Sequence, residues 1–442
     1  MRLARISAPI VRLAFLGLAS ASLLSGCGWF SDDEVLEGER VRIRAEPEAA
    51  AALAAPQAPL PEARTNADWT QTNGAANHNS GHLAGPSGLN AAWSVDAGAG
   101  ADSDGAITSA PIVVGGTVFT MDARSVLSAY DATSGSRRWQ TDISPAGENG
   151  GEGFGGGLAA DGGTIFATTG FGEVLAVNAA SGEILWRGSF GAPFRAAPAA
   201  QNGLVVAVTR DNTAVGLEAA DGKLRWRMRG ASSNAALLGG ASPAIVGPVA
   251  VLPFASGELV ALESRTGRRI WSAVLSGGRK GLARAAITDV SGDPVVVGSY
   301  VVAANQSGRM LAIDGRAGQR AWTRNVGSAS PIWAAGESIF LVSDDAKLMQ
   351  IAARDGTTVW ETQLAAFEDV KDLEDAIAYS GPVLVNGRLL FTDSLGNLHA
   401  HDAATGQPLG GARISGGSTT GPVVANGTVY VLSDNGTLHA FR

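Results

Sequence analysis

The chain has 442 residues with a formal net charge of −8, and 17% of its residues are charged. An acidic chain of this kind has no general electrostatic attraction for nucleic acid, so nucleic-acid binding is excluded as a main role. The single cysteine excludes an intramolecular disulfide, while 59 glycines are typical of a fold with many tight turns and few surface helices.

The N-terminus has the pattern of a secreted lipoprotein. Arg2, Arg5 and Arg12 precede or flank an apolar stretch over residues 13–24, which is too short to span a bilayer. This stretch ends in Leu24-Ser25-Gly26-Cys27, which resembles the bacterial lipobox. The resemblance implies that residues 1–26 are a cleaved signal peptide and that Cys27 is acylated. An ordinary secretory signal is the alternative.

Residues 27–65 have the composition of a flexible tether. Alanine, proline and glutamate dominate residues 46–61, and so few large apolar groups cannot offset the entropy cost of ordering the chain. Several acyl chains on Cys27 give stable membrane anchoring where one chain is marginal. Since Gly28 rather than an aspartate follows the cysteine, the lipobox resemblance implies an outer-membrane protein that faces the periplasm.

Residues 66–442 begin with a polar lead-in over 69–81 and a lone predicted strand over 89–93, which ends in Trp93. From there, a turn glycine followed four residues later by a tryptophan recurs roughly every 40–50 residues, which indicates a solenoid, a propeller or an array. The six copies are Gly135/Trp139, Gly182/Trp186, Gly222/Trp226, Gly267/Trp271, Gly318/Trp322 and Gly356/Trp360. A seventh copy, at Gly406, has Leu409-Gly410 in place of the tryptophan.

Each repeat contains four short alternating or β-branched runs separated by glycine, asparagine and aspartate, a pattern typical of strands. Four strands in a repeat of this length are the size of one propeller blade. The C-terminal repeat, residues 420–442, has three strands, and the strand at Trp93 lacks the three that should precede it. The sequence therefore predicts an all-β, eight-bladed β-propeller of four-stranded antiparallel blades over residues 66–442. Pairing of the Trp93 strand with the C-terminal strands closes the ring and removes two exposed edges.

The repeated tryptophans are predicted to be structural. In a propeller, each would pack between neighbouring blades with its indole N–H hydrogen-bonded, and each turn glycine would supply a positive φ. One interruption lies between two blades, at residues 365–378. Its apolar residues at 366, 367, 370, 373 and 377 have helical spacing, which predicts a helix packed on one rim.

Two patterns could carry chemistry, and neither has the context that its chemistry needs. Gly151-x-Gly153-x-x-Gly156 matches a dinucleotide-binding pattern, but a strand is predicted after it where a helix is required. His399 and His401 share one face of a strand and could form a metal site with His439, but no carboxylate recurs near them with ligand spacing. No serine lies in a Gly-x-Ser-x-Gly elbow. We expect no enzymatic activity, no metal and no cofactor.

The Gly-x-x-x-Trp element and the Ala-apolar-Asp element before it, as in Ala312-Ile313-Asp314, resemble the quinoprotein-type propeller family. One branch, the pyrroloquinoline-quinone dehydrogenases, has an adjacent cysteine pair over its cofactor, which this sequence lacks. The other is the BamB family of lipoproteins of the outer-membrane β-barrel assembly machine, and the resemblance to it covers residues 66–442 and the lipobox. Residues 287–297 are similar to that family's Ser-Asp-Val-Asp-x-x-Pro segment. Residues 236–243 are similar to its loop of leucine and arginine, which docks on the periplasmic POTRA domains of BamA.

This resemblance implies partner-binding residues in two interblade connections, where binding residues usually lie. Leu238 matches a docking leucine, Gly239 replaces the arginine, Asp289 matches the first aspartate and Ser291 stands where the second is expected. The implied set is Leu237, Leu238, Gly239, Arg284, Asp289 and Ser291. Burial of the two leucines at the start of a strand is the alternative for that pair.

The function that the resemblance implies is a non-enzymatic scaffold. It would dock on the POTRA domains of the barrel-assembly protein and assist the folding and insertion of outer-membrane proteins. Other members of the assembly machine and unfolded outer-membrane proteins are further expected partners. A quinone-dependent dehydrogenase and a sensor that binds a small molecule in its central channel are the alternatives.

Overall fold

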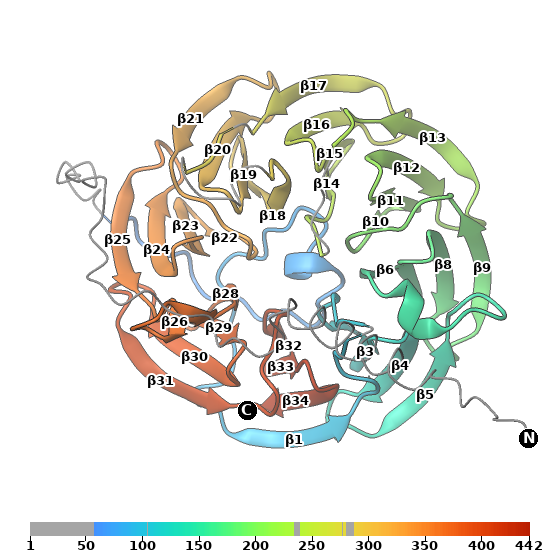
Figure 1. Cartoon of the computed structure of the whole chain (residues 1–442), viewed down its shortest axis with the longest axis horizontal. Coiled ribbons are helices and arrows are strands. Elements are labelled where there is room, and N and C mark those ends of the chain that lie inside the picture. The colour runs from blue at the N-terminus through green and yellow to red at the C-terminus, as the bar shows by residue number, and fades with distance from the viewer. Residues whose placement is uncertain (1–56, 104, 234–238, 276, 280–286) are drawn as a thin grey trace, which may run out of the picture. The chain divides into compact units, whose positions relative to one another are not determined.

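The computed structural model describes residues 57–103, 105–233, 239–275, 277–279 and 287–442. Eight four-stranded antiparallel sheets form a ring around a central axis (Figure 1), so the predicted fold class and blade number are confirmed. Two 3-10 turns, η1 (Thr72–Gly74) and η2 (Gly150–Gly153), are the helical elements of the described chain. No helix within these ranges is long and apolar enough to cross a membrane.

The first four blades follow one another in chain order, each from its innermost to its outermost strand. Blade 1 contains β2 (Ile112–Val114), β3 (Thr117–Met121), β4 (Val126–Asp131) and β5 (Arg137–Asp142). Blade 2 contains β6 (Gly156–Asp161), β7 (Thr164–Thr169), β8 (Glu173–Asn178) and β9 (Ile184–Ser189). Blade 3 contains β10 (Ala199–Gln201), β11 (Leu204–Val208), β12 (Thr213–Glu218) and β13 (Leu224–Arg229). Blade 4 contains β14 (Ala244–Val246), β15 (Val249–Pro253), β16 (Glu258–Glu263) and β17 (Arg269–Val274).

The remaining blades complete the ring. Blade 5 contains β18 (Val290–Val297), β19 (Tyr300–Asn305), β20 (Arg309–Asp314) and β21 (Arg320–Arg324). Blade 6 contains β22 (Trp333–Ala335), β23 (Ser338–Val342), β24 (Lys347–Ala352) and β25 (Thr358–Gln363). Blade 7 contains β28 (Tyr379–Val385), β29 (Arg388–Asp393), β30 (Asn397–Asp402) and β31 (Pro408–Arg413). Blade 8 contains β32 (Val423–Ala425), β33 (Thr428–Leu432), β34 (Thr437–Phe441) and β1 (Ala91–Asp96).

Burial follows the position of a strand within its blade. All five residues of β3 are buried, because both faces of this strand pack against neighbouring blades. The outermost strand β5 alternates exposed and half-buried residues, since one of its faces is open to solvent. This is why inner strands are continuous apolar runs whereas outer strands carry arginines between their apolar positions.

Blade 8 is built from both ends of the described propeller, as predicted. The strand β1 pairs antiparallel with β34, and Trp93 lies opposite Ala440. Beyond the strand ends, Asn90 and Arg442 exchange two backbone hydrogen bonds of 3.1 and 2.9 Å. The ring therefore has no unpaired edge at the junction of its ends.

The repeated tryptophans pack between blades, as predicted, and each contacts the turn glycine of the next blade. A Cβ added to that glycine would lie 2.4 to 2.8 Å from the preceding tryptophan side chain, and the glycines have φ of 69° to 76°. Six indole N–H groups donate to a carbonyl of the next blade at 2.8 to 3.2 Å. These pairs are Trp139 to Ala179, Trp186 to Ala219, Trp226 to Ser264, Trp271 to Gly315, Trp322 to Ala353 and Trp360 to Ala403.

The junction of the chain ends departs from this pattern. The Trp93 indole N–H is buried without a hydrogen-bond partner among the described residues. The equivalent carbonyl, that of Ala132, accepts instead from Tyr430 Oη at 3.1 Å and Arg442 Nη2 at 3.0 Å. On the other side of blade 8, Gly410 occupies the tryptophan position of blade 7 opposite Ala400. Blade 8 has no turn glycine at the equivalent position. Its two outermost strands, β34 and β1, come from opposite ends of the propeller and are not joined by a turn.

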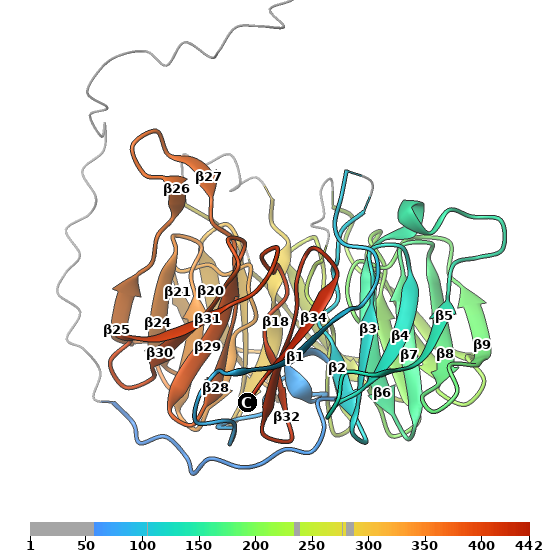
Figure 2. The same ribbon diagram turned by 90° about the horizontal axis from the view of Figure 1, so that it is seen from below.

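The helix predicted over residues 365–378 is wrong. This segment forms a two-stranded hairpin of β26 (Phe367–Asp369) and β27 (Glu374–Ala376) that projects from the ring (Figure 2). Asp369 Oδ1 accepts from the backbone N–H of Lys371 and Asp372, which initiates a turn inside the predicted helix. Val370 is 71% exposed, so the apolar stripe has no surface to cover it and a helix would gain no burial.

The polar lead-in makes a circuit of the ring. Between Asn66 and Leu83 it forms a hydrogen bond with the innermost strand of every blade, or with the turn that follows that strand. In lead-in order the partners are Val424 and Asn426, Val113, Ala160, Ala200, Ile245, Val296, Trp333 and Leu384. We call residues 66–83 the strap. Its turn η1 lies at the centre of the ring (blue in Figure 1), and Trp69 stacks on Trp333 with ring centroids 5.8 Å apart.

The described part of the expected tether also contacts the propeller. Arg64 N–H donates to the carbonyl of His82 at 2.9 Å, and the carbonyl of Arg64 accepts from Ala84 at 2.8 Å. The imidazole Nδ1 of His82 lies 2.7 Å from the carbonyl of Pro61. Residues 57–65 therefore run along the same face of the ring as the strap, as Figure 2 shows.

Candidate functional site

The connections between blades gather on one face of the ring, which we call the interblade face. Each leads from the outermost strand of one blade to the innermost strand of the next, so all begin and end on the same side. The strap bonds to the opposite ends of the innermost strands. In Figure 2 the β26–β27 hairpin marks the interblade face, and the lead-in runs along the other face.

The structure places three of the six predicted docking residues. Leu237, Leu238 and Arg284 lie outside the described residues. Gly239 is exposed on the connection between blades 3 and 4, with φ of +68°. Asp289, which ends the connection between blades 4 and 5, and Ser291, the second residue of β18, are both buried. The two predicted segments therefore belong to adjacent connections on one face.

A buried arginine joins these two connections. Arg195, on the connection between blades 2 and 3, is 1% exposed, and its Nη1 contacts both carboxylate oxygens of Asp289, with 2.6 Å to Oδ1. Gly240 packs directly on the guanidinium, because a Cβ there would lie 2.5 Å from Nη1. The Nε and Nη2 groups of Arg195 have no hydrogen-bond partner in the described chain. Arg195 thus links three consecutive connections at one point.

Hydroxyl groups connect further blades around the channel. The Ser291 hydroxyl donates to the carbonyl of Ser328 at 2.9 Å, and the Ser380 hydroxyl donates to that of Thr419 at 2.6 Å. The Thr168 hydroxyl donates to the carbonyl of Ala196 at 2.8 Å. Each bond crosses from one blade to the start of the next, so the connections are fixed relative to one another. Ser291 therefore has a partner inside the ring.

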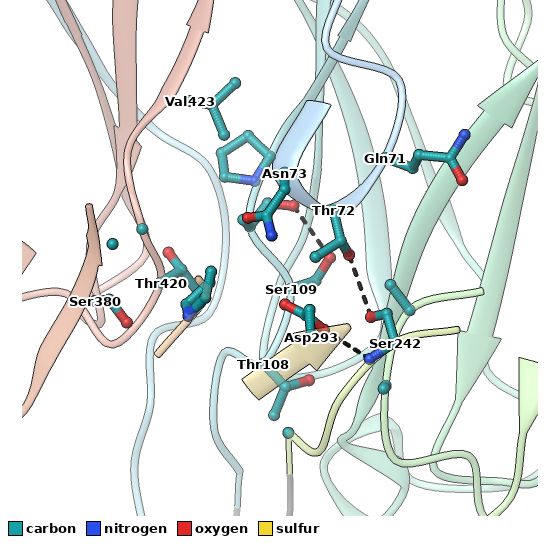
Figure 3. Close-up of a pocket in the computed structure, with 18 of the residues that line it drawn as sticks. Gln71, Thr72, Asn73, Thr108, Ser109, Ser242, Asp293, Ser380, Thr420 and Val423 are labelled. Atoms are coloured by element: carbon teal, nitrogen blue, oxygen red, sulfur yellow. Dashed lines mark hydrogen bonds between the residues drawn. The ribbon is translucent and has the colours of Figure 1, made fainter. Parts of the chain in front are cut away.

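A central cavity of about 150 Å³ lies between the strap and the first residues of the innermost strands (Figure 3). Thr72 and Asn73 of the strap line it, together with Ser242 from the connection between blades 3 and 4 and Asp293 of blade 5. Asp293 Oδ1 accepts from the backbone N–H of Ser242 at 2.7 Å, and the hydroxyls of Thr72 and Ser242 lie 3.2 Å apart. The cavity wall therefore includes the connection that carries Gly239.

Burial shifts the two titratable groups beside this cavity in opposite directions. It raises the pKa of the Asp293 carboxyl above its ordinary value, because the charged form is desolvated. It lowers the pKa of His78, whose Nδ1 lies 3.0 Å from the carbonyl of Pro294. Both shifts favour the neutral form of the side chain.

The histidines and the glycine-rich motif lie apart from the interblade docking segments. His399 Nε2 is 2.8 Å from Asp393 Oδ2, and His401 Nδ1 is 2.9 Å from the carbonyl of Gly406. His439 contacts serine hydroxyls within blade 8 and its junction with blade 7. Across the described ranges, no three His, Cys, Asp or Glu side chains are grouped so as to hold a metal ion. The motif of Gly151, Gly153 and Gly156 spans η2 and leads into strand β6.

Sequence reasoning missed Arg195, Asn73 and Asp293. Asp293 lies two residues after Ser291, and a carboxylate just before a proline at the start of an inner strand was the available signal. Arg195 is a lone charge between Phe194 and Ala196, which could have indicated a buried ion pair. No pattern in the sequence links residue 195 to residue 289.

Comparisons with known proteins identify the family. The family model described as outer membrane protein assembly factor BamB matches residues 86–153, 123–362 and 351–442. Outer membrane protein assembly factor BamB of Escherichia coli (strain K12) is 30% identical over 438 residues, which cover 97% of this chain and 98% of that protein.

Two solved structures share the fold. BamB from Moraxella catarrhalis aligns with a TM-score of 0.67 at 21% identity, covering 80% of this chain and 100% of that one. Quinohemoprotein alcohol dehydrogenase from Comamonas testosteroni aligns with a TM-score of 0.66 at 14% identity, covering 86% and 81%. At these identities both likenesses concern the fold alone, whereas the family model matches residues 86–442 and the E. coli relative covers 97% of the chain. The chain belongs to the BamB family of outer membrane protein assembly factors.

Proposed function

We propose that the protein is a non-enzymatic scaffold of the outer-membrane β-barrel assembly machine, and that it docks on the POTRA domains of the barrel-assembly protein through its interblade face. The observation that carries this proposal is the link of three consecutive connections through Arg195, Asp289 and Gly240. Family membership supports the assembly role. A surface held rigid before binding loses little entropy when a partner docks.

The docking residues divide into two roles. Leu237, Leu238, Gly239 and Arg284 are the direct contacts, and two adjacent leucines fit the apolar centre of an interface. Asp289 and Ser291 act indirectly from buried positions, because their side chains form hydrogen bonds with Arg195 and with Ser328. They hold the two docking connections in place.

The lipid on Cys27 anchors the scaffold to the outer membrane, on the periplasmic side. Residues 27–56 then connect the anchor to Gln57, the first described residue. The assembly machine's other members and unfolded outer-membrane proteins are the further partners of this scaffold.

The test is binding of the purified protein to purified POTRA domains. We expect Leu238→Asp to weaken binding by about 30-fold, since loss of a central interface anchor costs roughly 2 kcal/mol. The matched control is Leu185→Asp, because Leu185 is 50% exposed on the outer strand β9. This control should bind like the unmodified protein.

Two results separate the parts of this proposal. If Leu238→Asp binds normally while remaining folded, the docking site is wrong and the scaffold role stands. If the unmodified protein does not bind POTRA domains, docking itself is rejected.

A further inference from the structure

The central cavity contains two buried polar side chains, and the amide N–H of one of them has no hydrogen-bond partner within the described chain. Asn73 is 6% exposed, and its Nδ2 has no hydrogen-bond partner there. Asp293 is 8% exposed and forms no salt bridge with a described residue. Figure 3 shows both side chains at the wall of the same space. A buried polar group without a partner is costly, so the Asn73 amide favours a ligand that accepts from it. The Asp293 carboxylate accepts from the Ser242 backbone N–H and has the capacity to accept further hydrogen bonds.

The two side chains favour different ligand atoms. The carboxylate of Asp293 accepts hydrogen bonds and attracts positive charge, whereas the Asn73 amide N–H donates to an oxygen. Asp293 is the charged residue among the described residues that line the cavity. The hydroxyls of Thr72, Ser109 and Thr420 add groups that can donate or accept. A ligand that fits carries both a cationic donor and an acceptor oxygen.

We propose that the central cavity binds a small primary amine that also carries a hydroxyl or carbonyl oxygen, with its ammonium group on Asp293 and its oxygen on Asn73 Nδ2. The cavity volume of about 150 Å³ suits a molecule of a few non-hydrogen atoms. Burial of Asp293 disfavours its ionised form, and an incoming cation restores that form. Arg195 and His78 are the other charged or titratable groups that act on Asp293, and both favour its ionised form, so an ammonium group acts on the carboxyl in the same direction.

Hydrogen bonds to the ring hold both ligand-binding residues in place. Asn73 belongs to the strap, which bonds to all eight blades, and has a φ of +54° that its backbone turn requires. Asp293 is held by the backbone of Ser242, whose hydroxyl lies 3.2 Å from that of Thr72. The two ligand-binding groups are therefore fixed before a ligand arrives, which reduces the entropy cost of binding.

The experiment compares four probes of similar size on the full mature protein by titration calorimetry and by thermal shift. Ethanolamine has both the ammonium and the oxygen, ethylamine lacks the oxygen, ethylene glycol lacks the charge, and glycolate has the opposite charge. We expect ethanolamine to bind most tightly, ethylamine and ethylene glycol more weakly, and glycolate not at all. Equal binding of all four probes, or no binding of ethanolamine, overturns the proposal.

Two variants assign the contacts. Asp293→Asn should weaken ethanolamine binding by about tenfold or more, as expected for loss of a hydrogen bond to a charged group. Asn73→Gly retains the positive φ and should weaken ethanolamine without changing ethylamine. Glu183→Gln, at an exposed turn of blade 2, is the control for general charge effects. If Asp293→Asn does not fold, the probe series and Asn73→Gly still decide the outcome.

Discussion

Arg195 and Asp289 form the most deeply buried ion pair of the described propeller, with side chains 1% and 0% exposed. A buried pair gains little net stability over well-packed apolar residues, because both charges lose their hydration. Removing one partner is different, since the other charge stays buried and loses the opposite charge of this pair. The pair is therefore better explained by the position that it imposes on three interblade connections than by the free energy of folding that it contributes.

This distinction can be measured with one single and one double variant. Arg195→Met should lower the free energy of unfolding by roughly 3 kcal/mol, because the buried carboxylate of Asp289 loses the charge-assisted hydrogen bonds from the Arg195 guanidinium. The double variant Arg195→Met/Asp289→Leu should recover most of that loss of stability. It should nevertheless bind POTRA domains more weakly than the unmodified protein, since the ion pair no longer fixes the connections. Denaturant unfolding and the binding assay give the two values. A double variant with full binding would show that the pair has no positioning role.

At the scale of elements, the packing of each tryptophan against the turn glycine of the next blade sets the distance between neighbouring blades. The sequence contained the turn glycine and the tryptophan of this contact at a fixed spacing in each repeat, so the blades, their number and the closure at Trp93 could be predicted. The hairpin at 367–376 could not, because helical spacing of apolar residues indicates a helix only where a surface covers the stripe. Val370 and Leu373 face solvent instead.

Two glycines of blade 2 allow the effect of the tryptophan contact to be measured apart from the effect of the left-handed backbone conformation. Gly182 has φ of +76°, and a Cβ there would lie 2.6 Å from the Trp139 ring. Gly163 has φ of +82° with open space around it. Gly163→Ala should cost about 1 kcal/mol for the left-handed backbone alone. Gly182→Ala should cost about 1–3 kcal/mol more, because the methyl group overpacks the indole. Equal losses in thermal or denaturant unfolding would mean that the tryptophan contact is not restrictive.

At the scale of the whole molecule, the strap changes how the blades depend on one another. In a repeat protein each unit contacts its neighbours only, and stability is close to a sum over units and interfaces. Here one segment of the chain hydrogen-bonds to all eight blades and stacks Trp69 on Trp333. The strap, Arg195 and Asn73 were not predictable, because each depends on single residues without a repeat and their partners lie far away in sequence.

We therefore expect the strap to make unfolding of the ring cooperative. The unmodified protein should unfold in one calorimetric transition with equal calorimetric and van't Hoff enthalpies. A chain that begins at Leu89 should unfold at a lower temperature and over a broader range, because its blades are joined only to their neighbours. Trp69→Ala is the matched comparison. It removes a buried indole at a cost of about 3–5 kcal/mol but keeps the strap's backbone bonds, so its midpoint should fall while the transition stays sharp. A truncated chain that unfolds as sharply as the full one would mean that ring closure at β1 and β34 alone couples the blades.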